Sequence, residues 1–515
     1  MIEYLRLAFG TVVVLLPGAA VARALGQRSA SARLAWGMAC VFVAWATVFT
    51  LHRSIHLAVA VLVLITAVAL ALRLRNLRLR NERVSVSEPG AGVRVWALGI
   101  VLGWFLWHVE GPVLGDGLFH EARVRKLVAL GGLHLRTVDE FKDGGLHPGY
   151  AFPLWHGFLA LVSWVSGVDA GGVLRHEPSL LAPVACVVAW EAGAVLFDSR
   201  WAGASVLLAT LAVFCFAPGH GGSYTSLSLP ATAARQLLVP AAIALFFARS
   251  GWRTWAALAA VFGALVLTHP TYALFLLIPL VGYAAVRAVE WRAWAPALGA
   301  AVVPTGLALL WLKPIVDETV SHDPGPGERA RAIAHYGSSL VVSDDRHYRL
   351  AAQMFGRSGV VAVAALVLLP LAGLALRRRW AAFALGGTLL VLVLMLVPWL
   401  FVHVSDAVSI SQSRRAAGFA PLPFALAGAL ALVARRVAVL PAALVAGIVL
   451  QRLWPGDFDY GLSHGGPAPA TWFALGGGAV ALGLGLALRP REPSEHHLLG
   501  AAAMLCLTLP VLVHG

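Results

Sequence analysis

Long apolar runs are the feature that most constrains this chain. They recur from one end of the 515 residues to the other, and each is long enough to cross about 30 Å of hydrocarbon as a helix. With 59% hydrophobic and 12% charged residues, the chain has more apolar surface than a soluble fold of this length can bury. The sequence therefore predicts an all-α polytopic membrane protein of about 16 transmembrane helices, near residues 5–22, 34–51, 55–72, 95–110, 179–197, 202–217, 235–249, 254–268, 271–288, 294–313, 358–376, 381–402, 418–434, 437–451, 471–488 and 497–513.

The distribution of arginine predicts how these helices are oriented. The net charge is +14, and the basic residues gather in short loops between the apolar runs, most densely at 73–83 and 377–379. This is the positive-inside pattern of membrane proteins, so we do not expect a nucleic-acid partner. Both termini then face outward. A crossing helix over 150–168 would reverse every later basic loop, so we interpret that segment as an interfacial or partly embedded helix on the outer face.

The spans and loops predict four regions. Residues 1–90 are an N-terminal three-helix addition ending in a basic cytoplasmic loop, and 91–313 form the core, with a long outer loop at 111–178. A second outer loop at 314–357 precedes the C-terminal transmembrane helices at 358–515. The first loop is expected to carry two interfacial helices, near 118–131 and 150–167. The four cysteines lie within apolar spans and show no metal-ligand spacing, which is typical of packing residues.

An acidic turn opens the first outer loop, directly after an apolar helix. Asp116, His120 and Glu121 follow one another at helical spacing, so they are expected at the membrane surface. If the helix begins near Gly117, Asp116 stands about where an N-cap belongs, and capping with a solvated helix face is one reading. The other is catalytic, because a carboxylate can take the proton from an attacking hydroxyl and His120 can orient it.

A second polar stretch, "HPGYAFPLWH", begins at His147. His147 and His156 stand at the start of the second surface helix, together with Tyr150. Two histidines so close together favour a substrate-binding site, whereas the aromatic residues alone would be ordinary anchors at the membrane interface.

The order of these motifs resembles a known family of membrane enzymes. "HEARVRKLVALGGL" is followed by "HPGYAFPLWHGFLALVSWVSGVD" and then by "RHEPSLLAPVACVVAWEAGAVLF", and "ALVLTHPTYALFLL" suggests a tight outer hairpin. This arrangement resembles the polyprenyl-phosphate-dependent glycosyltransferases of the GT-C fold, of the protein mannosyltransferase and aminoarabinose-transferase type. The resemblance covers roughly residues 95–290 in order.

The resemblance implies transfer of a sugar, with inversion, from a polyprenyl-phosphate-linked donor to a hydroxyl of a cell-envelope glycan, lipid or protein acceptor. The family's adjacent Asp-Glu pair aligns with His120 and Glu121, leaving Asp116 four residues ahead. Either Asp116 or Glu121 could therefore be the base, and Asp116 is preferred because it lies nearest the helix end. "HPGY" also stands where the family has "HPPL", which leaves the role of His147 open.

A lipid-phosphate leaving group needs fixed positive charge. The candidates are outward-facing cations near helix starts, namely Arg235, Arg414 and Arg415, where the helix dipole also favours an anion. His269 is expected to face the same cavity as these arginines, where the lipid phosphate would bind. Contact with phospholipid headgroups is the alternative for these arginines. No cofactor is predicted, and the chain lacks zinc-ligand spacing. For Asp344, Asp345, Arg346 and His347 a solvated loop is favoured, while acceptor recognition or a divalent metal stays open.

Two other classes of function compete with the enzyme. A transporter or a flippase for lipid-linked sugars usually shows repeats and ionisable residues at mid-membrane, whereas these spans look nearly free of charge. The third alternative is a non-catalytic membrane scaffold. Contact with membrane lipids is expected in every case.

Overall fold

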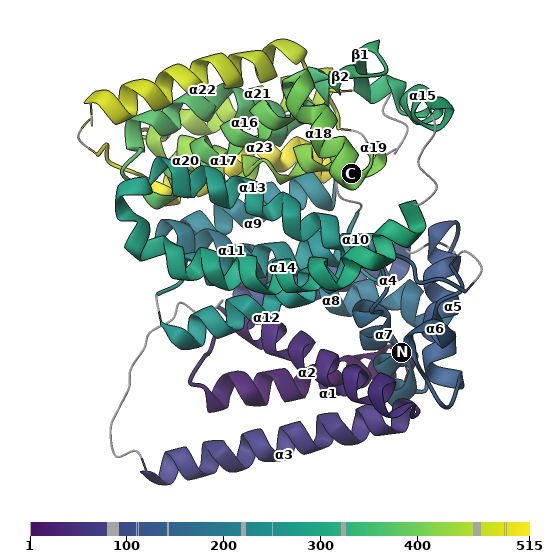
Figure 1. Ribbon diagram of the computed structural model, residues 1–515. Coiled ribbons are helices and arrows are strands. Elements are labelled where there is room, and N and C mark those ends of the chain that lie inside the picture. Colours follow the sequence, from purple (N-terminus) through teal and green to yellow (C-terminus); the bar gives the residue numbers. More distant parts are fainter. Residues whose placement is uncertain are drawn as a thin grey trace. The chain divides into compact units, whose positions relative to one another are not determined.

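The computed structural model describes most of the chain, at residues 2–79, 92–109, 111, 113–141, 144–217, 223–249, 251–320, 326–456, 465–488, 490 and 492–514. The second half of the predicted basic loop, with Arg80 and Arg83, lies outside these residues. Figure 1 shows an almost entirely helical chain, and its contacts divide it into two compact units.

Unit 1 comprises residues 1–192, 224–273 and 296–321. It contains the N-terminal helices, the acidic turn and the segment around Arg235. Its elements are α1 (Ile2–Ala24), α2 (Ala30–Leu51), α3 (Ile55–Leu79), α4 (Val93–Val109), α5 (Asp116–Ala129), α6 (Leu135–Val138), α7 (Leu154–Ser166), most of α8 (Ala170–Phe197), η1 (Tyr224–Ser226), α10 (Pro230–Ala233), the π-helix η2 (Ala234–Leu238), α11 (Val239–Phe247), α12 (Trp252–Thr268), the start of α13 (Pro270–Val286) and most of α14 (Trp291–Val320).

Unit 2 comprises residues 193–223, 274–295 and 322–515. Besides the remainders of α8, α13 and α14, its elements are α9 (Arg200–Phe214), η3 (Ala288–Glu290), α15 (Pro326–His335), η4 (Gly337–Ser339), β1 (Leu340–Asp344), β2 (His347–Leu350), η5 (Ala352–Gly356), α16 (Val360–Leu368), η6 (Leu369–Ala375), α17 (Arg379–Leu396), α18 (Pro398–Val408), α19 (Ile410–Ser413), η7 (Arg414–Phe419), α20 (Leu422–Val433), α21 (Val439–Leu453), α22 (Ala468–Leu488) and α23 (His497–His514). The strands form an antiparallel hairpin with Leu340 opposite Leu350, and β2 packs on α18.

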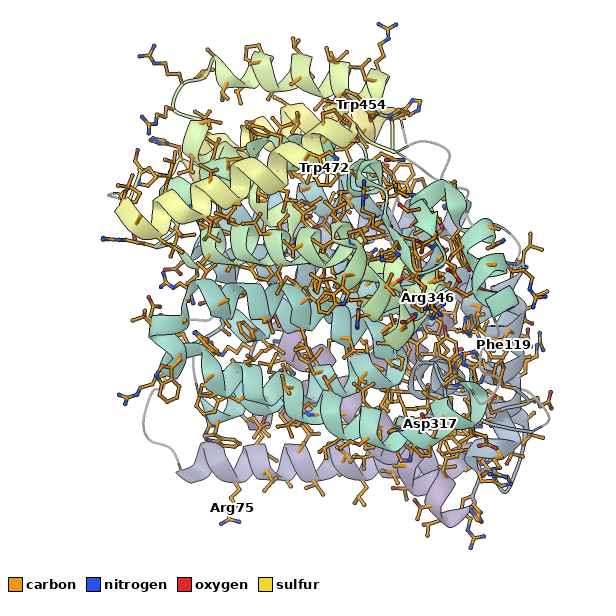
Figure 2. The ribbon with its side chains drawn as sticks, turned by 45° about the horizontal axis from the view of Figure 1, so that its top comes forward. Arg75, Phe119, Asp317, Arg346, Trp454 and Trp472 are labelled. Carbon is orange, nitrogen blue, oxygen red and sulfur yellow. The ribbon has the colours of Figure 1, made fainter. Side chains whose placement is uncertain are left out.

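Every predicted span falls on a helix. Among the described residues, 10 helices are long and apolar enough to cross a membrane, and the other predicted spans fall on shorter apolar helices of 10–17 residues. The prediction of a helical polytopic membrane protein is therefore confirmed. Arg75, near the end of α3, points away from its helix, as expected for a basic loop flanking a span (Figure 2).

The loop that the sequence predicts at 111–178 is shorter in the structure, because α8 begins at Ala170 rather than near 179. Its second helix, α7, also has unexpected surroundings. α7 packs against α1, α2 and α5, and nearly all of its side chains are buried, although Trp164 is exposed. The amphipathic surface helix expected there is thus a helix enclosed on most sides by protein.

Small residues allow the first helices of unit 1 to pack closely. A Cβ atom on Gly18 of α1 would lie 2.1 Å from the backbone nitrogen of Gly37 on α2, and one on Gly157 of α7 would lie 2.3 Å from the Trp45 ring. Because glycine has no side chain, the backbone of Gly37 can approach Gly18 and the Trp45 ring can lie against Gly157, as is typical of closely packed membrane bundles. Helices α1, α2 and α7 lie side by side in Figure 1.

Two buried acids on α8 correct the expectation that the spans are nearly free of charge. Glu191 accepts hydrogen bonds from Ala30 N at 2.7 Å, Ser31 N at 2.8 Å and Ser31 Oγ at 2.6 Å, so it satisfies the first amides of α2. A carboxylate suits this position because the N-terminal end of a helix carries partial positive charge.

Glu177 has the opposite environment. Its Oε1 lies 2.8 Å from Thr11 Oγ1, which is also 2.9 Å from Leu7 O, and its Oε2 is buried with no partner among the described residues. A hydroxyl has one proton, so both Thr11 contacts form as hydrogen bonds when Thr11 donates to Leu7 O and a protonated Glu177 donates to Thr11. Glu177 is therefore assigned as a neutral acid and Glu191 as a charged one.

This difference predicts opposite responses to the same substitution. Glu177→Gln keeps a neutral donor facing Thr11 and should change the free energy of unfolding by less than about 1 kcal/mol. Glu191→Gln places an NH₂ group against amide donors and should cost about 1–3 kcal/mol. The measurement is the unfolding midpoint of each variant in detergent, and equal losses in the two variants would contradict the assignment.

Candidate functional site

The carboxylate of Asp116 has no hydrogen-bond or ion-pair partner among the described residues. The N-cap of α5 is Gly115, whose φ of 55° favours glycine, and Asp116 is the first helical residue. The expectation that Asp116 caps the helix is therefore wrong. The side chain is exposed, and no hydrogen bond or ion pair joins it to another residue that the structure describes. It remains available to a substrate.

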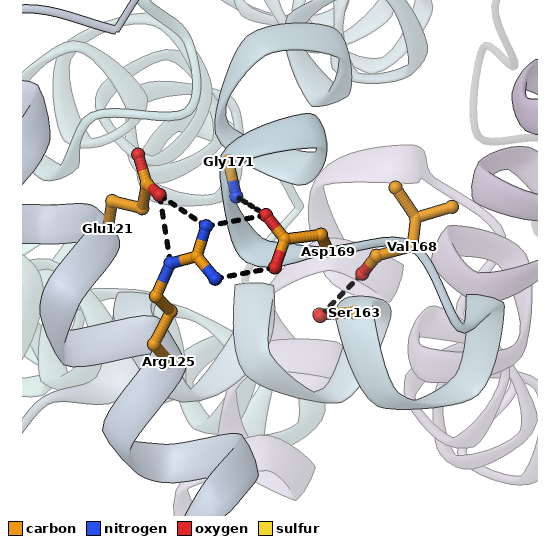
Figure 3. Close-up of polar contacts among 6 residues, drawn as sticks. All are labelled: Glu121, Arg125, Ser163, Val168, Asp169 and Gly171. Atoms are coloured by element: carbon orange, nitrogen blue, oxygen red, sulfur yellow. Dashed lines mark hydrogen bonds and ion pairs between the residues drawn. The ribbon is translucent and has the colours of Figure 1, made fainter.

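Glu121 is held in an ion-pair cluster (Figure 3). Arg125 donates to Glu121 Oε1 from Nε at 2.9 Å and from Nη2 at 2.7 Å. The same guanidinium donates to Asp169 at 2.7 and 2.6 Å, and Asp169 also accepts from Gly171 N at 3.0 Å. This cluster fastens α5 to the first turn of α8, so Glu121 has a structural partner, whereas Asp116 has none in the described part of the chain.

His120 and His156 form a buried pair rather than an exposed site. His120 Nδ1 lies 2.9 Å from His156 Nε2, and Tyr150 stands edge-on to both rings. The exposed fractions of His120 and His156 are 5% and 1%. Burial, with smaller contributions from the charges of Arg123 and His147, lowers the pKa of His120 to about 3, so this imidazole is neutral.

A buried ion pair supports the histidines. Arg123 Nη2 lies 2.9 Å from Asp139 Oδ2 and donates to Tyr150 O at 3.2 Å, while Arg123 Nε and Nη1 are buried without a partner in the described part of the chain. Asp139 also accepts the backbone N–H of His147 at 2.6 Å. Because Asp139 fixes the backbone of His147 and Arg123 contacts Tyr150, the pair connects α5 to the "HPGY" stretch.

The neutral state of His120 predicts loss of stability in acid. An unfolded histidine takes up a proton below about pH 6.5, whereas folded His120 stays neutral down to about pH 3, so unfolding is favoured as the pH falls between these values. The part of the unfolding free energy that depends on His120 is fully present above pH 6.5. It should fall by about 1 kcal/mol between pH 6 and pH 5. His120→Asn, which keeps a polar partner for His156 but does not titrate, should remove that part of the pH dependence. The measurement is the free energy of unfolding at pH 6 and at pH 5. The same change in the His120→Asn variant and in the unsubstituted chain would contradict the role assigned to His120.

Arg235 and His269 belong to one buried cluster in unit 1. Arg235 lies in the π-helix η2, in the second turn of the helix that begins at Pro230, so the expected position at a helix N-terminus is wrong. Tyr272 is an electrostatic neighbour of Arg235 and stacks on His269 at 3.9 Å between ring centroids. Arg235 and His269 therefore both have Tyr272 as a neighbour, and both are more than nine-tenths buried, while the cavity expected to join them stays a prediction.

Unit 2 holds a cluster of like charges around Arg414. The Arg414 guanidinium lies 3.8 Å from the centroid of the Tyr336 ring, and its Nη1 donates to Ser339 Oγ at 3.3 Å. Its Nε is buried without a partner among the described residues. Arg415 and Arg357 act on Arg414 as like charges, and Arg357 is buried to 8% exposure. Three guanidinium groups brought together in this way favour an anion.

The turn of the β-hairpin pairs a histidine with an aspartate. His347 Nδ1 lies 3.0 Å from Asp344, whose pKa is lowered chiefly by a hydrogen bond from Arg346 N. Across the described ranges, no group of three or more His, Cys, Asp or Glu side chains is placed to hold a metal ion.

Comparison of the chain with protein-family models, with curated proteins and with solved structures finds no match. The site is therefore interpreted from its own geometry. Sequence reasoning missed Arg123, Asp139 and Arg357 as parts of these clusters. The only available signal for Asp139 was an acid placed shortly before the "HPGY" stretch, in a chain where acids are scarce.

Proposed function

We propose that this protein is a membrane glycosyltransferase. It transfers a sugar from a polyprenyl-phosphate donor to a cell-envelope acceptor hydroxyl, with inversion, at the extracytoplasmic face of the cell membrane. The observation that carries this proposal is the exposed, uncommitted carboxylate of Asp116 at the head of α5, beside a Glu121 that is already paired with Arg125. A base must be free to meet the proton that it removes.

In the proposed reaction the acceptor oxygen attacks the anomeric carbon of the donor sugar. The bond between that carbon and the phosphate oxygen breaks, the acceptor proton passes to Asp116, and polyprenyl phosphate leaves with the negative charge. His120 and His156 position α5 and do not exchange protons at neutral pH, because burial keeps His120 neutral, with its pKa near 3.

Two sets of cations are candidates for the leaving phosphate. Arg235, with Tyr272 and His269, is the candidate in unit 1, and Arg414, with Arg415, is the candidate in unit 2. Preorganised guanidinium groups stabilise developing phosphate charge without reorganising during the reaction. In this proposal the 10 long apolar helices cross the membrane, and so do the shorter apolar helices other than α7. Together they give the sixteen crossings of a GT-C-like bundle.

The proposal is tested by a transfer assay with the purified chain in proteoliposomes. The probes are sugars labelled with ¹⁴C on undecaprenyl and decaprenyl phosphate, mannose and arabinose among them, together with cell-envelope glycan fragments as acceptors. Labelled glycan is the expected product. Absence of label in the acceptor with every donor would overturn the enzyme assignment.

A flippase for lipid-linked sugars is the second candidate, because Glu177 is a buried acid inside a membrane-spanning helix and such groups often mark transport pathways. The same proteoliposomes distinguish it. Movement of labelled lipid-linked sugar between leaflets without transfer to the acceptor would favour this candidate.

A further inference from the structure

Four aromatic rings gather beside Asp116 on the surface of unit 1. Ring centroids are 5.8 Å apart for Phe119 and His147, 4.9 Å for His147 and Tyr150, and 4.5 Å for Phe141 and His147. Phe119 is 37% exposed and lies at the surface in Figure 2, and the other three rings are partly exposed. The rings therefore form an accessible platform rather than a closed core.

Arg123 and His120 hold the rings of this platform in place. Arg123 lies 5.2 Å from the Phe119 ring and 6.0 Å from the Tyr150 ring, and Tyr150 is fixed edge-on against His120 at 5.2 Å. His147 Nδ1 accepts the backbone N–H of Gly149 at 3.0 Å. The rings are thus ordered before any ligand arrives, which reduces the entropy lost on binding.

Polar groups border the rings. Asp116 precedes Phe119 by three residues, a spacing that places two side chains next to each other on a helix surface. Because His147 Nδ1 is an acceptor, the neutral ring carries its proton on Nε2, where it is a donor. Burial, followed by the charge of Arg123, lowers the pKa of His147, so the neutral form prevails at neutral pH.

Aromatic faces bordered by a carboxylate and an N–H donor match the chemistry of a sugar. A sugar ring has a face of C–H groups that packs on an aromatic ring, and hydroxyl groups at its edge that donate and accept hydrogen bonds. A lipid chain has no group for the Asp116 carboxylate, and leaving that carboxylate against hydrocarbon is costly.

We propose that Phe119, His147 and Tyr150 form the acceptor subsite, on which a sugar unit of a glycan stacks with its hydroxyl groups directed to Asp116 and to His147 Nε2. This inference rests on the proposed function and narrows the acceptor from any cell-envelope hydroxyl to that of a glycan.

The test is saturation-transfer NMR with the full chain in lipid nanodiscs. The probes are methyl glycosides of mannose, glucose, galactose and arabinofuranose, with cyclohexanol as an apolar control. At least one glycoside should receive saturation. Phe119→Leu should weaken its binding by roughly fivefold to tenfold, because it removes the ring but keeps apolar volume. Phe105→Leu is the matched control, since Phe105 is an exposed phenylalanine on α4, and it should leave binding unchanged.

Each outcome bears on one proposal. Saturation of cyclohexanol alone, no saturation at all, or equal effects of the two leucine variants would overturn the subsite. Asp116→Asn should still bind the glycoside while failing to transfer sugar to it. Glycoside binding that depends on Phe119, in a chain without transfer activity, would overturn the proposed enzyme and keep the sugar platform.

Discussion

Replacing Asp116 with Asn is expected to lower the rate of sugar transfer by about 10²–10⁴-fold, which is the usual contribution of a general base. Asn retains the shape of the side chain but cannot accept the acceptor's proton. Because Asp116 is exposed and bonded to no other described residue, the substitution should leave the unfolding midpoint unchanged. The measurement is the initial rate of label transfer in proteoliposomes, with unfolding followed in the same preparations.

Glu121→Gln is the matched control for that experiment. It removes a carboxylate of similar chemistry five residues along α5, at a position where Arg125 is the partner and Asp169 still holds that arginine. We expect its transfer rate to stay within tenfold of the unsubstituted chain. An inactive Glu121→Gln variant beside an active Asp116→Asn variant would assign the base to Glu121. Full activity in both would refute a carboxylate base on α5.

The second large effect is expected at Asp139. Asp139→Asn leaves the buried Arg123 guanidinium without a counter-charge, and breaking a buried ion pair on one side typically costs about 3–5 kcal/mol. The substitution also weakens acceptance of the backbone N–H groups of Phe141 and His147. The unfolding free energy in detergent should fall by that amount, and the platform around His147 should lose its order.

Asp169→Asn is the control for burial. Asp169 also pairs with an arginine of α5, but both side chains are more than half exposed, at 61% for Asp169 and 51% for Arg125. Surface pairs contribute about 0–1 kcal/mol because water screens them, so this variant should be nearly as stable as the unsubstituted chain. Similar losses at Asp139 and Asp169 would contradict the role assigned to the buried pair.

Parts of the candidate site were predictable from local spacing. Asp116, His120 and Glu121 do lie on one helix, and the "HPGYAFPLWH" stretch does contact that helix through Tyr150 and His156. The roles within this set were not predictable. The sequence preferred Asp116 over Glu121 only because Asp116 lies nearest the helix end. The structure adds that Glu121 is paired with Arg125, an arginine that Asp169 also holds.

The spacing of residues in the sequence also did not predict which polar side chains are buried. His120 and His156 are 36 residues apart and were expected at an open cavity, yet they meet as a closed pair. Arg235 was placed at a helix start because "SLSLPATAA" precedes it, but Pro230 is compatible with the first turn of a helix and the helix begins there.

The sequence by itself determined that this chain is a helical membrane protein, where its apolar helices lie, and that an acidic turn follows the fourth of them. Hydrocarbon thickness and the requirement for internal backbone hydrogen bonds impose those features on each segment separately. Only the tertiary structure decided which carboxylate has no partner among the described residues, which histidines are neutral, and which acid on α8 holds a proton. Those properties depend on the partners that folding brings to each side chain, such as His156 for His120 and Thr11 for Glu177, and the chain order does not specify such partners.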